Sequence, residues 1–110
     1  MTTRGEWEAA VAAGRYVAAG YEGDGFIHLS TPEQVVRVAN ARFAGVGDLV
    51  LLCVAPDRLS APLRYEVGDP GSTELFPHLY GPLNADAVVQ VLPFAEGSDG
   101  FVLPVGAGDR

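Results

Sequence analysis

The sequence predicts an α+β domain, because two amphipathic helices come early in the chain and short strands dominate afterwards. Helical spacing of apolar residues is confined to the first 43 residues. The later chain consists of apolar or alternating runs separated by glycine, proline and acidic turns. No internal repeat or change of composition divides the 110 residues. We therefore expect a single domain over residues 1–110, with the end, residues 106–110, frayed.

The composition is that of a folded, acidic protein. The chain is 48% hydrophobic and only 19% charged, which favours a packed core over disorder. Its net charge of −7 repels phosphate backbones, so general nucleic-acid binding is not expected. No apolar run approaches the roughly 20 residues needed to span a bilayer, and no signal sequence is visible. We expect a cytoplasmic protein that does not associate with membranes.

A first helix is expected to begin after Thr2 or Thr3, either of which can cap it, and to run to about Ala13. Gly14 then ends the helix. Three residues at helical spacing form the face expected to be buried: Trp7, Ala10 and Val11. The glycine-rich stretch 15–24 lacks the spacing of a phosphate-binding loop and is expected to be an ordinary loop.

The start of a second helix is marked by Thr31 at the N-cap, Pro32 at the first position and Gln34 at the third, which completes a capping box. We expect this helix to run to about Phe43 and to end before Gly45. The positions expected to be buried are Val35, Val36, Ala39 and Phe43.

Most of the remaining chain is expected to form strands. These are predicted at Phe26–Ser30, Leu49–Ala55, Leu63–Val67, Ala87–Phe94 and Phe101–Val105, with a loop at 96–100. The run 49–55 is apolar at every position, so we expect it to be buried on both faces at the centre of a sheet. It contains Cys53, the only cysteine, which is expected to be a buried, inert thiol.

A histidine and a tyrosine lie between two prolines, Pro77 and Pro82. Each proline fixes a backbone φ angle and removes a hydrogen-bond donor, so this segment cannot be an ordinary helix. In an extended run, His78 and Tyr80 point to one face and Leu79 points to the other. An imidazole and a phenol that share a strand face indicate one wall of a site.

Two other predicted strands show the same alternation. Phe26, His28 and Ser30 share one face of the first, and Arg64 and Glu66 share one face of the other. If these strands lie in one sheet, or in two facing sheets, both histidines could meet the charged pair and the tyrosine. This convergence is a hypothesis, since alternation assigns faces and not distances.

The residues expected to carry catalysis are His28, His78 and Glu66, and those expected to bind a ligand are Phe26, Ser30, Arg64 and Tyr80. An imidazole can serve as a general base or as a donor to an anion, and an arginine fork can hold a phosphate or carboxylate. Structural alternatives exist for each: histidines packed in strands, Ser30 as a helix cap, and Arg64 and Glu66 on a solvated strand face. The two histidines and Glu66 could also form a metal site, although no short-spaced ligand pair supports it.

Four sequence blocks resemble a known family. They are Glu-Trp-Glu-Ala-Ala at 6–10, Gly-Phe-Ile-His-Leu-Ser-Thr at 25–31, Asp-Leu-Val-Leu-Leu at 48–52 and Leu-Phe-Pro-His-Leu-Tyr-Gly-Pro-Leu at 75–83. The chain resembles the small bacterial family known as domain of unknown function nine-fifty-two, from about residue 6 to about residue 94. The resemblance implies a strongly bent, split β-sheet with two N-terminal helices, a fold grouped with ADP-ribosyltransferase-like proteins.

In active relatives of that fold a cleft holds NAD, so the resemblance makes NAD a candidate cofactor, although the family itself has no established activity and the sequence alone leaves the cofactor unknown. It also implies that His28, Ser30, His78 and Tyr80 line the cleft, with the charged residues of 63–67 beside them. The chain departs from the family at its front. Relatives begin with a short strand, whereas residues 1–4 are expected to lead straight into the first helix.

These observations together predict a domain whose polar cleft binds a small nucleotide-like or anionic molecule. If the domain is an enzyme, the expected reaction is transfer of an ADP-ribosyl or phosphoryl group. Three alternatives remain open at this point: a non-catalytic ligand-binding module, a metal-dependent hydrolase that uses His28, His78 and Glu66, and a protein-interaction domain without a small-molecule site.

Overall fold

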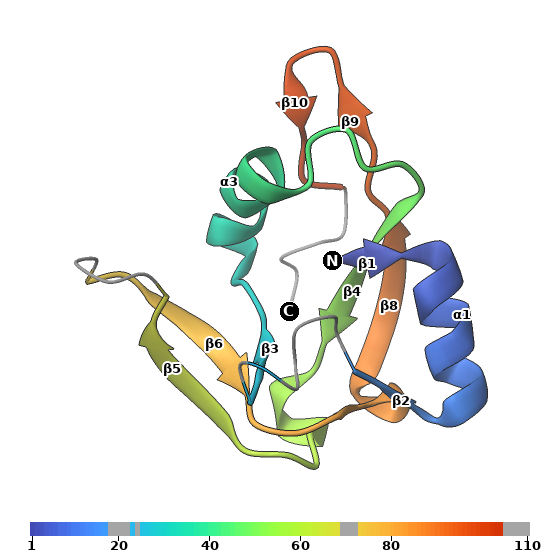
Figure 1. Cartoon of the computed structure of the whole chain (residues 1–110), viewed down its shortest axis with the longest axis vertical. Helices are drawn as coiled ribbons and strands as arrows, with labels where there is room; N and C mark the ends of the chain where they lie inside the picture. The colour runs from blue at the N-terminus through green and yellow to red at the C-terminus, as the bar shows by residue number, and fades with distance from the viewer. Residues whose placement is uncertain (18–22, 24, 69–72, 105–110) are drawn as a thin grey trace.

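The computed structural model describes residues 1–17, 23, 25–68 and 73–104. Within these residues two α-helices accompany two three-stranded antiparallel sheets, which confirms the α+β class (Figure 1). One sheet contains β1 (Thr2–Thr3), β4 (Leu49–Val54) and β8 (Val88–Pro93), and the other contains β3 (Ile27–His28), β6 (Leu75–Leu79) and β5 (Leu63–Val67). Neither helix of this described part is long and apolar enough to cross a bilayer. Residues 106–110, expected to fray, lie outside the described residues.

β4 is the central strand of its sheet, as its continuous apolar sequence predicts. It pairs with β1 on one side and with β8 on the other. Leu49, Val50 and Leu51 are buried, because both faces of the strand are covered. The register against β8 shifts between Cys53 and Val54. The cysteine at this irregularity is only partly buried, so the expectation of full burial was wrong.

Helix α1 (Arg4–Ala13) has the predicted boundaries. Thr3 is the N-cap, and its hydroxyl accepts a hydrogen bond from the Glu6 N–H at 3.3 Å. The Glu6 carboxylate reaches back to the cap residue, which completes a capping box. Gly14 ends the helix with φ of 82°, a left-handed conformation that glycine adopts without steric cost.

Three expectations about this region were wrong. Thr2 and Thr3 pair with β4, so a short strand does precede α1. A second short strand, β2 (Arg15–Tyr16), lies within the expected loop and pairs with β7 (Leu83–Asn84). Val11, expected in the core, is 53% exposed, whereas Ala10 is buried and Trp7 packs against the core. The rest of the expected loop falls largely outside the described residues.

Helix α3 (Pro32–Arg42) begins with the predicted cap. Thr31 is the N-cap, and its N–H donates to the Gln34 side-chain oxygen at 3.1 Å. Val35 and Ala39 are buried, as expected, and Val36 and Phe43 pack against the same core from partly exposed positions.

Short elements complete the chain. Two 3₁₀ turns, η1 (Pro56–Arg58) and η2 (Ala85–Ala87), lie close to each other in the fold. β9 (Glu96–Gly97) and β10 (Gly100–Phe101) form a small hairpin where a loop was expected at 96–100. A strand was predicted at 101–105, but among the described residues of that range only Phe101, at the end of β10, is in a strand. Phe101 is buried.

Two hydrophobic clusters hold these layers together. The first joins α1 to both sheets, and its buried members are Ala10, Tyr16, Ile27, Leu79, Leu83 and Ala87. The second packs α3 against β4 and the C-terminal hairpin, and its buried members are Val35, Ala39, Leu49, Leu51, Phe94 and Phe101. The sheet β3–β6–β5 therefore covers the first cluster with one of its faces and leaves the other face for polar residues.

We expect Leu79→Ala to be among the most destabilising substitutions in the chain. Leu79 is 0% exposed and lies in the first cluster, so the change would leave a cavity and cost about 2–5 kcal/mol of unfolding free energy. Urea unfolding would measure this loss. Val102→Ala is the control, because Val102 is 72% exposed and its truncation should change stability by less than about 0.5 kcal/mol. Equal losses in the two variants would contradict this assignment of the core.

Candidate functional site

The polar face of the sheet β3–β6–β5 brings the predicted residues together. His28 lies directly opposite His78 in the β3–β6 pairing, and Arg64 lies opposite His78 in the β5–β6 pairing. Because paired residues on adjacent strands point to the same face, these three side chains form one row across the sheet. On the other face, Ile27 and Leu79 are buried in the core.

The backbone of β6 explains how close the two histidines come. The Pro77 carbonyl accepts from the Leu29 N–H at 2.9 Å, and the Tyr80 N–H donates to the Pro62 carbonyl at 2.8 Å. Hydrogen-bonding groups of alternate residues point to opposite edges of a strand, so those of His78 point towards β5. His28 and His78 are therefore a non-hydrogen-bonded pair, the type in which side chains approach most closely. Their ring centroids are 5.3 Å apart.

Glu66 joins a histidine and a tyrosine through a single oxygen. Its Oε1 lies 3.0 Å from His78 Nδ1 and also accepts a hydrogen bond from the Tyr80 hydroxyl. Glu66 is diagonal to His78 in the register, since it lies opposite Phe76. Tyr80 is two residues beyond His78, and its ring extends along the sheet so that its hydroxyl contacts the Glu66 carboxylate. Cross-strand diagonals of this kind are within reach of long and aromatic side chains.

This contact determines which nitrogen of His78 faces solvent. The ring is nearly buried, with 4% of the side chain exposed, and its Nδ1 donates to the carboxylate when the imidazole is neutral. Nε2 then carries the lone pair. It has no hydrogen-bond partner among the described residues, and no fully buried polar side-chain atom of these residues lacks a partner. Nε2 therefore retains contact with solvent.

The same hydrogen bonds fix the charge of Glu66. The Tyr80 hydroxyl, and then His78, hold the pKa of the Glu66 carboxyl below its ordinary value, because both stabilise the ionised form. The carboxylate in turn raises the pKa of the Tyr80 hydroxyl, since it accepts the proton of the neutral phenol. The second carboxylate oxygen, Oε2, has no partner in the described part of the chain, and 38% of the Glu66 side chain is exposed.

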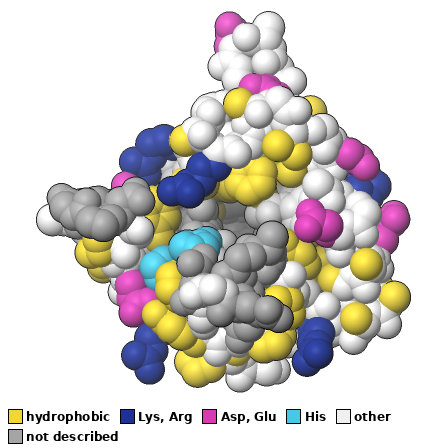
Figure 2. All heavy atoms as spheres, in the orientation of Figure 1, with side chains coloured by type: hydrophobic (Ala, Val, Ile, Leu, Met, Phe, Trp, Pro, Cys, Tyr) yellow, Lys and Arg dark blue, Asp and Glu magenta, His cyan; other side chains and the backbone are white. Residues whose placement is uncertain are grey.

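Aromatic rings and a guanidinium surround this cluster. Phe26 stacks on His78 with 4.2 Å between ring centroids, and its ring also lies 4.8 Å from that of His28. The Arg64 guanidinium carbon is 5.4 Å from the centre of the Tyr80 ring. Figure 2 shows histidine side chains reaching the surface of this face, with basic side chains nearby over α3.

Two expectations for this face are not supported. Ser30, expected to bind a ligand, is partly buried beyond β3 and makes no hydrogen bond to the cluster within the described residues. It is not the helix cap either, because that position belongs to Thr31. The metal-site alternative is not supported, since no group of three histidine, cysteine or acidic side chains among the described residues could hold a metal ion. One oxygen of Glu66 and Nδ1 of His78 are instead joined by a hydrogen bond.

Sequence reasoning missed an ion pair and a hollow. Glu74 forms an ion pair with Arg37 of α3 and accepts a hydrogen bond from Gln34 at 3.1 Å. It therefore ties the start of β6 to the helix, and the Arg37 guanidinium lowers the pKa of the Glu74 carboxyl. These residues are about 40 positions apart, so no local pattern could reveal the contact.

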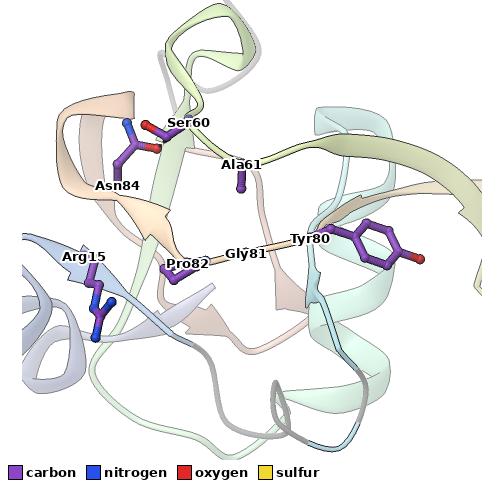
Figure 3. Close-up of a pocket in the computed structure, with 7 residues that line it drawn as sticks. All are labelled: Arg15, Ser60, Ala61, Tyr80, Gly81, Pro82 and Asn84. Carbon is purple, nitrogen blue, oxygen red and sulfur yellow. Dashed lines mark hydrogen bonds between the residues drawn. The ribbon is translucent and has the colours of Figure 1, made fainter.

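The hollow, of about 400 Å³, lies beside the segment that follows β6. Its lining residues are Arg15, Ser60, Ala61, Tyr80, Gly81, Pro82 and Asn84. Figure 3 shows that the Tyr80 ring points away from Arg15 and Asn84, so the hollow and the Glu66 cluster lie on opposite sides of Tyr80, the one residue that they share. Asn84 closes one side and is held by the Ser60 N–H and the Arg58 carbonyl.

Comparison with known proteins identifies the family. The sequence profile described as "Protein of unknown function (DUF952)" matches residues 1–91. The chain belongs to the DUF952 family. No curated protein matches. The DUF952 assignment confirms the resemblance expected from the four sequence blocks.

Solved structures agree with this assignment. The chain is similar to the X-ray structure of protein CC0527 from Caulobacter crescentus, with 40% identity, a TM-score of 0.80, and coverage of 91% of this chain and 87% of that one. The solution NMR structure of the same protein gives 40% identity and a TM-score of 0.75, over 90% of this chain and 84% of that one. The X-ray structure of a double mutant of CC0527 matches with 39% identity and a TM-score of 0.80, over 91% of this chain and 87% of that one.

We expect the unfolding free energy of Glu66→Gln to fall less steeply with decreasing pH than that of the wild type. The pKa of Glu66 is lower in the folded chain than its unfolded value of about 4.3, so its charge stabilises the fold above that value. This contribution disappears as the pH falls through the folded pKa. The glutamine variant should therefore be less stable than the wild type near neutral pH, and the difference should shrink towards pH about 3.

Urea midpoints measured across this pH range would test the expectation. Glu8→Gln is the matched control, because Glu8 is exposed on α1 and should leave the wild-type pH profile unchanged. Some acid dependence should remain in both variants, since the pKa of Glu74 is also lowered. A difference between Glu66→Gln and wild type that stays constant with pH would contradict the proposed charge state.

Proposed function

We propose that this DUF952 domain binds a small anionic, nucleotide-like molecule on the polar face of the sheet β3–β6–β5. The observation that carries the proposal is the contact between Glu66 Oε1 and His78 Nδ1, which holds a nearly buried imidazole with Nε2 open to solvent. A carboxylate that orients an imidazole in this way is a recurrent arrangement for a general base or a hydrogen-bonding anchor.

The groups around the imidazole suit an anion attached to a ring. Arg64 is exposed, and its planar fork can hold a phosphate or carboxylate with two hydrogen bonds. Phe26 and Tyr80 present aromatic surface beside it, on which a base could stack. His28 is exposed next to His78 and can supply a further donor. Ser30 is proposed only as a residue at the margin of this surface.

We extend the proposal to transfer of an ADP-ribosyl or phosphoryl group, with NAD as the donor in the first case and an ADP-ribosyltransferase-like fold as its basis. In this chemistry His78 Nε2 would take the proton of the attacking hydroxyl as the new bond to the transferred group forms. The bond to the leaving group breaks at the same centre, and neutral nicotinamide needs no proton. Glu66 would orient His78 through Oε1 and face developing positive charge with Oε2.

A second candidate function is binding without catalysis. It is favoured by the same surface, because Oε1 of Glu66 is already engaged by two donors in the absence of a ligand. The two candidates differ in one measurement. Release of nicotinamide from NAD that is lost in Glu66→Gln would support transfer, whereas binding of ADP-ribose without turnover would support the binding module.

A thermal-shift screen would test the binding proposal. The wild type, His78→Ala and Arg64→Ala would be heated with NAD, ADP-ribose, nucleotides and phosphorylated sugars. A ligand at 100 times its dissociation constant stabilises the native state by about 2.7 kcal/mol, which raises the melting temperature by several degrees in a domain of this size. We expect at least one of these anions to give such a shift, and both variants to reduce it.

Arg58→Ala is the control for charge. Arg58 is exposed on η1 and is not one of the residues of the proposed site, so its replacement removes one positive charge, as Arg64→Ala does, and leaves that site unchanged. It should keep the wild-type shift. If no anion stabilises the wild type, or if the Arg58 variant loses the shift as fully as the Arg64 variant, then the proposed site is wrong.

A further inference from the structure

The outer edge of β5 is the longer of the two edges of the sheet β3–β6–β5, because β5 has five residues and β3 has two. β5 is a terminal strand of that sheet and pairs only with β6. Figure 1 shows it on the rim of the molecule, with no helix or strand drawn along its outer side. An edge strand presents unpaired N–H and C=O groups that can template pairing with another strand.

The register decides which groups face outward. The hydrogen-bonding groups of His78 point towards β5, so its partner Arg64 points towards β6, and Glu66 does the same two residues later. The N–H and C=O groups of Leu63, Tyr65 and Val67 therefore point out of the sheet. In the described part of the chain these groups have no recorded partner.

This edge carries only part of the usual protection against association, namely the two charged residues Arg64 and Glu66. Residues 63–67 contain no proline or lysine, and natural edge strands use both to prevent pairing. The apolar side chains near the end of the β5–β6 hairpin are instead exposed, with Tyr65 at 54%, Val67 at 46% and Leu75 at 50%. Val67 lies opposite Leu75, so the exposed residues are neighbours on one face of the hairpin.

The sequence of β5 is complementary to itself in one antiparallel register. Leu-Arg-Tyr-Glu-Val reads apolar, positive, aromatic, negative, apolar in both directions, apart from the exchange of the two charges. A two-fold axis at Tyr65 pairs Tyr65 with its copy, Leu63 with Val67 and Arg64 with Glu66. Opposite charges then face each other twice on the polar face, and apolar side chains face each other on the other.

Hydrogen bonding selects the same register. Pairs centred on Tyr65 join residues whose N–H and C=O groups all point outward, so they form hydrogen-bonded pairs. Arg64 and Glu66 then fall in non-hydrogen-bonded pairs, where side chains are closest. A two-fold axis at Arg64 or at Glu66 would instead place like charges opposite each other, and a shift of one residue would mix the two faces of the sheet.

We propose that the edge of β5 is the interface of a homodimer, formed by antiparallel pairing of β5 with a second copy of this chain about Tyr65. The two sheets then join into one continuous sheet of six strands. Each copy places its Arg64 opposite Glu66 of the other, whose Oε2 has no partner in the described part of the single chain. The inference does not rest on the proposed function. In the dimer Arg64 and Glu66 Oε2 engage each other and not a ligand, so pairing about Tyr65 and ligand binding at these two groups compete.

Reversal of the two charges tests the register. We expect light scattering after gel filtration, over micromolar to millimolar protein, to give the wild type a mass approaching twice the 11.5 kDa of one chain. Arg64→Glu alone and Glu66→Arg alone should each remain at 11.5 kDa, because like charges then face each other twice. An equimolar mixture of these two variants should return to the doubled mass, since each acid of one chain then meets a base of the other.

A second pair of variants tests the edge without changing charge. Tyr65→Pro removes an outward N–H and leaves the β5–β6 hydrogen bonds intact, so it should be monomeric, whereas Tyr65→Phe should remain dimeric. Circular dichroism would check that each variant folds. If a charge variant does not fold, the comparison of Tyr65→Pro with Tyr65→Phe still tests the interface. A monomeric wild type at every concentration overturns the proposal. So does a dimer that survives Tyr65→Pro, or a mixture of charge variants that stays monomeric.

Discussion

The two-sided pairing of β6 is the constraint on which the rest of the site depends. β6 lies between β3 and β5, and Pro77 has no N–H to offer either neighbour. Its carbonyl nevertheless accepts a hydrogen bond from the N–H of Leu29, just beyond β3. This bond fixes which residues of β6 direct their hydrogen-bonding groups towards β3 and which direct them towards β5. Leu79 is thereby directed into the core and His78 to the opposite face. A slip of one residue would bury the polar side chains and expose the apolar ones.

Glu66 converts that arrangement into a defined electrostatic environment. A carboxylate with two donors on one oxygen stays ionised, and it keeps Nδ1 of His78 protonated and the Tyr80 hydroxyl neutral. The half-exposed position of Glu66 keeps this charged group in contact with water, which avoids the large cost of burying a carboxylate.

The sequence predicted those features that depend on local pattern. The cap formed by Thr31 and Gln34, the central position of β4 and the polar faces of 26–28, 64–66 and 78–80 all follow from alternation, capping or apolar runs. The short strands β1, β2, β9 and β10 have two residues each, too few to show a period. β1 and β2 form because the distant strands β4 and β7 pair with them, whereas β9 and β10 pair with each other across a short turn.

The contacts within the site could not be predicted in the same way. Alternation placed Glu66 and His78 on compatible faces, but the diagonal contact depends on Glu66 lying opposite Phe76, which is a property of the β5–β6 register. Alternation could not place Ser30 for a related reason, because β3 ends at His28 and the chain turns towards α3 before Ser30 can continue the strand. Val11 has the correct helical spacing but lies at the exposed margin of α1, where the core does not reach.

The shared oxygen of Glu66 has a consequence for how substitutions combine. His78 and Tyr80 act on the same acceptor, so each alters the strength of the other's hydrogen bond even though the two side chains come from different points along the segment. Their energetic effects will be coupled and not additive, as is usual for residues in one network. The three residues therefore form a thermodynamic unit, and single replacements among them will be tolerated less readily than replacements that adjust all three together.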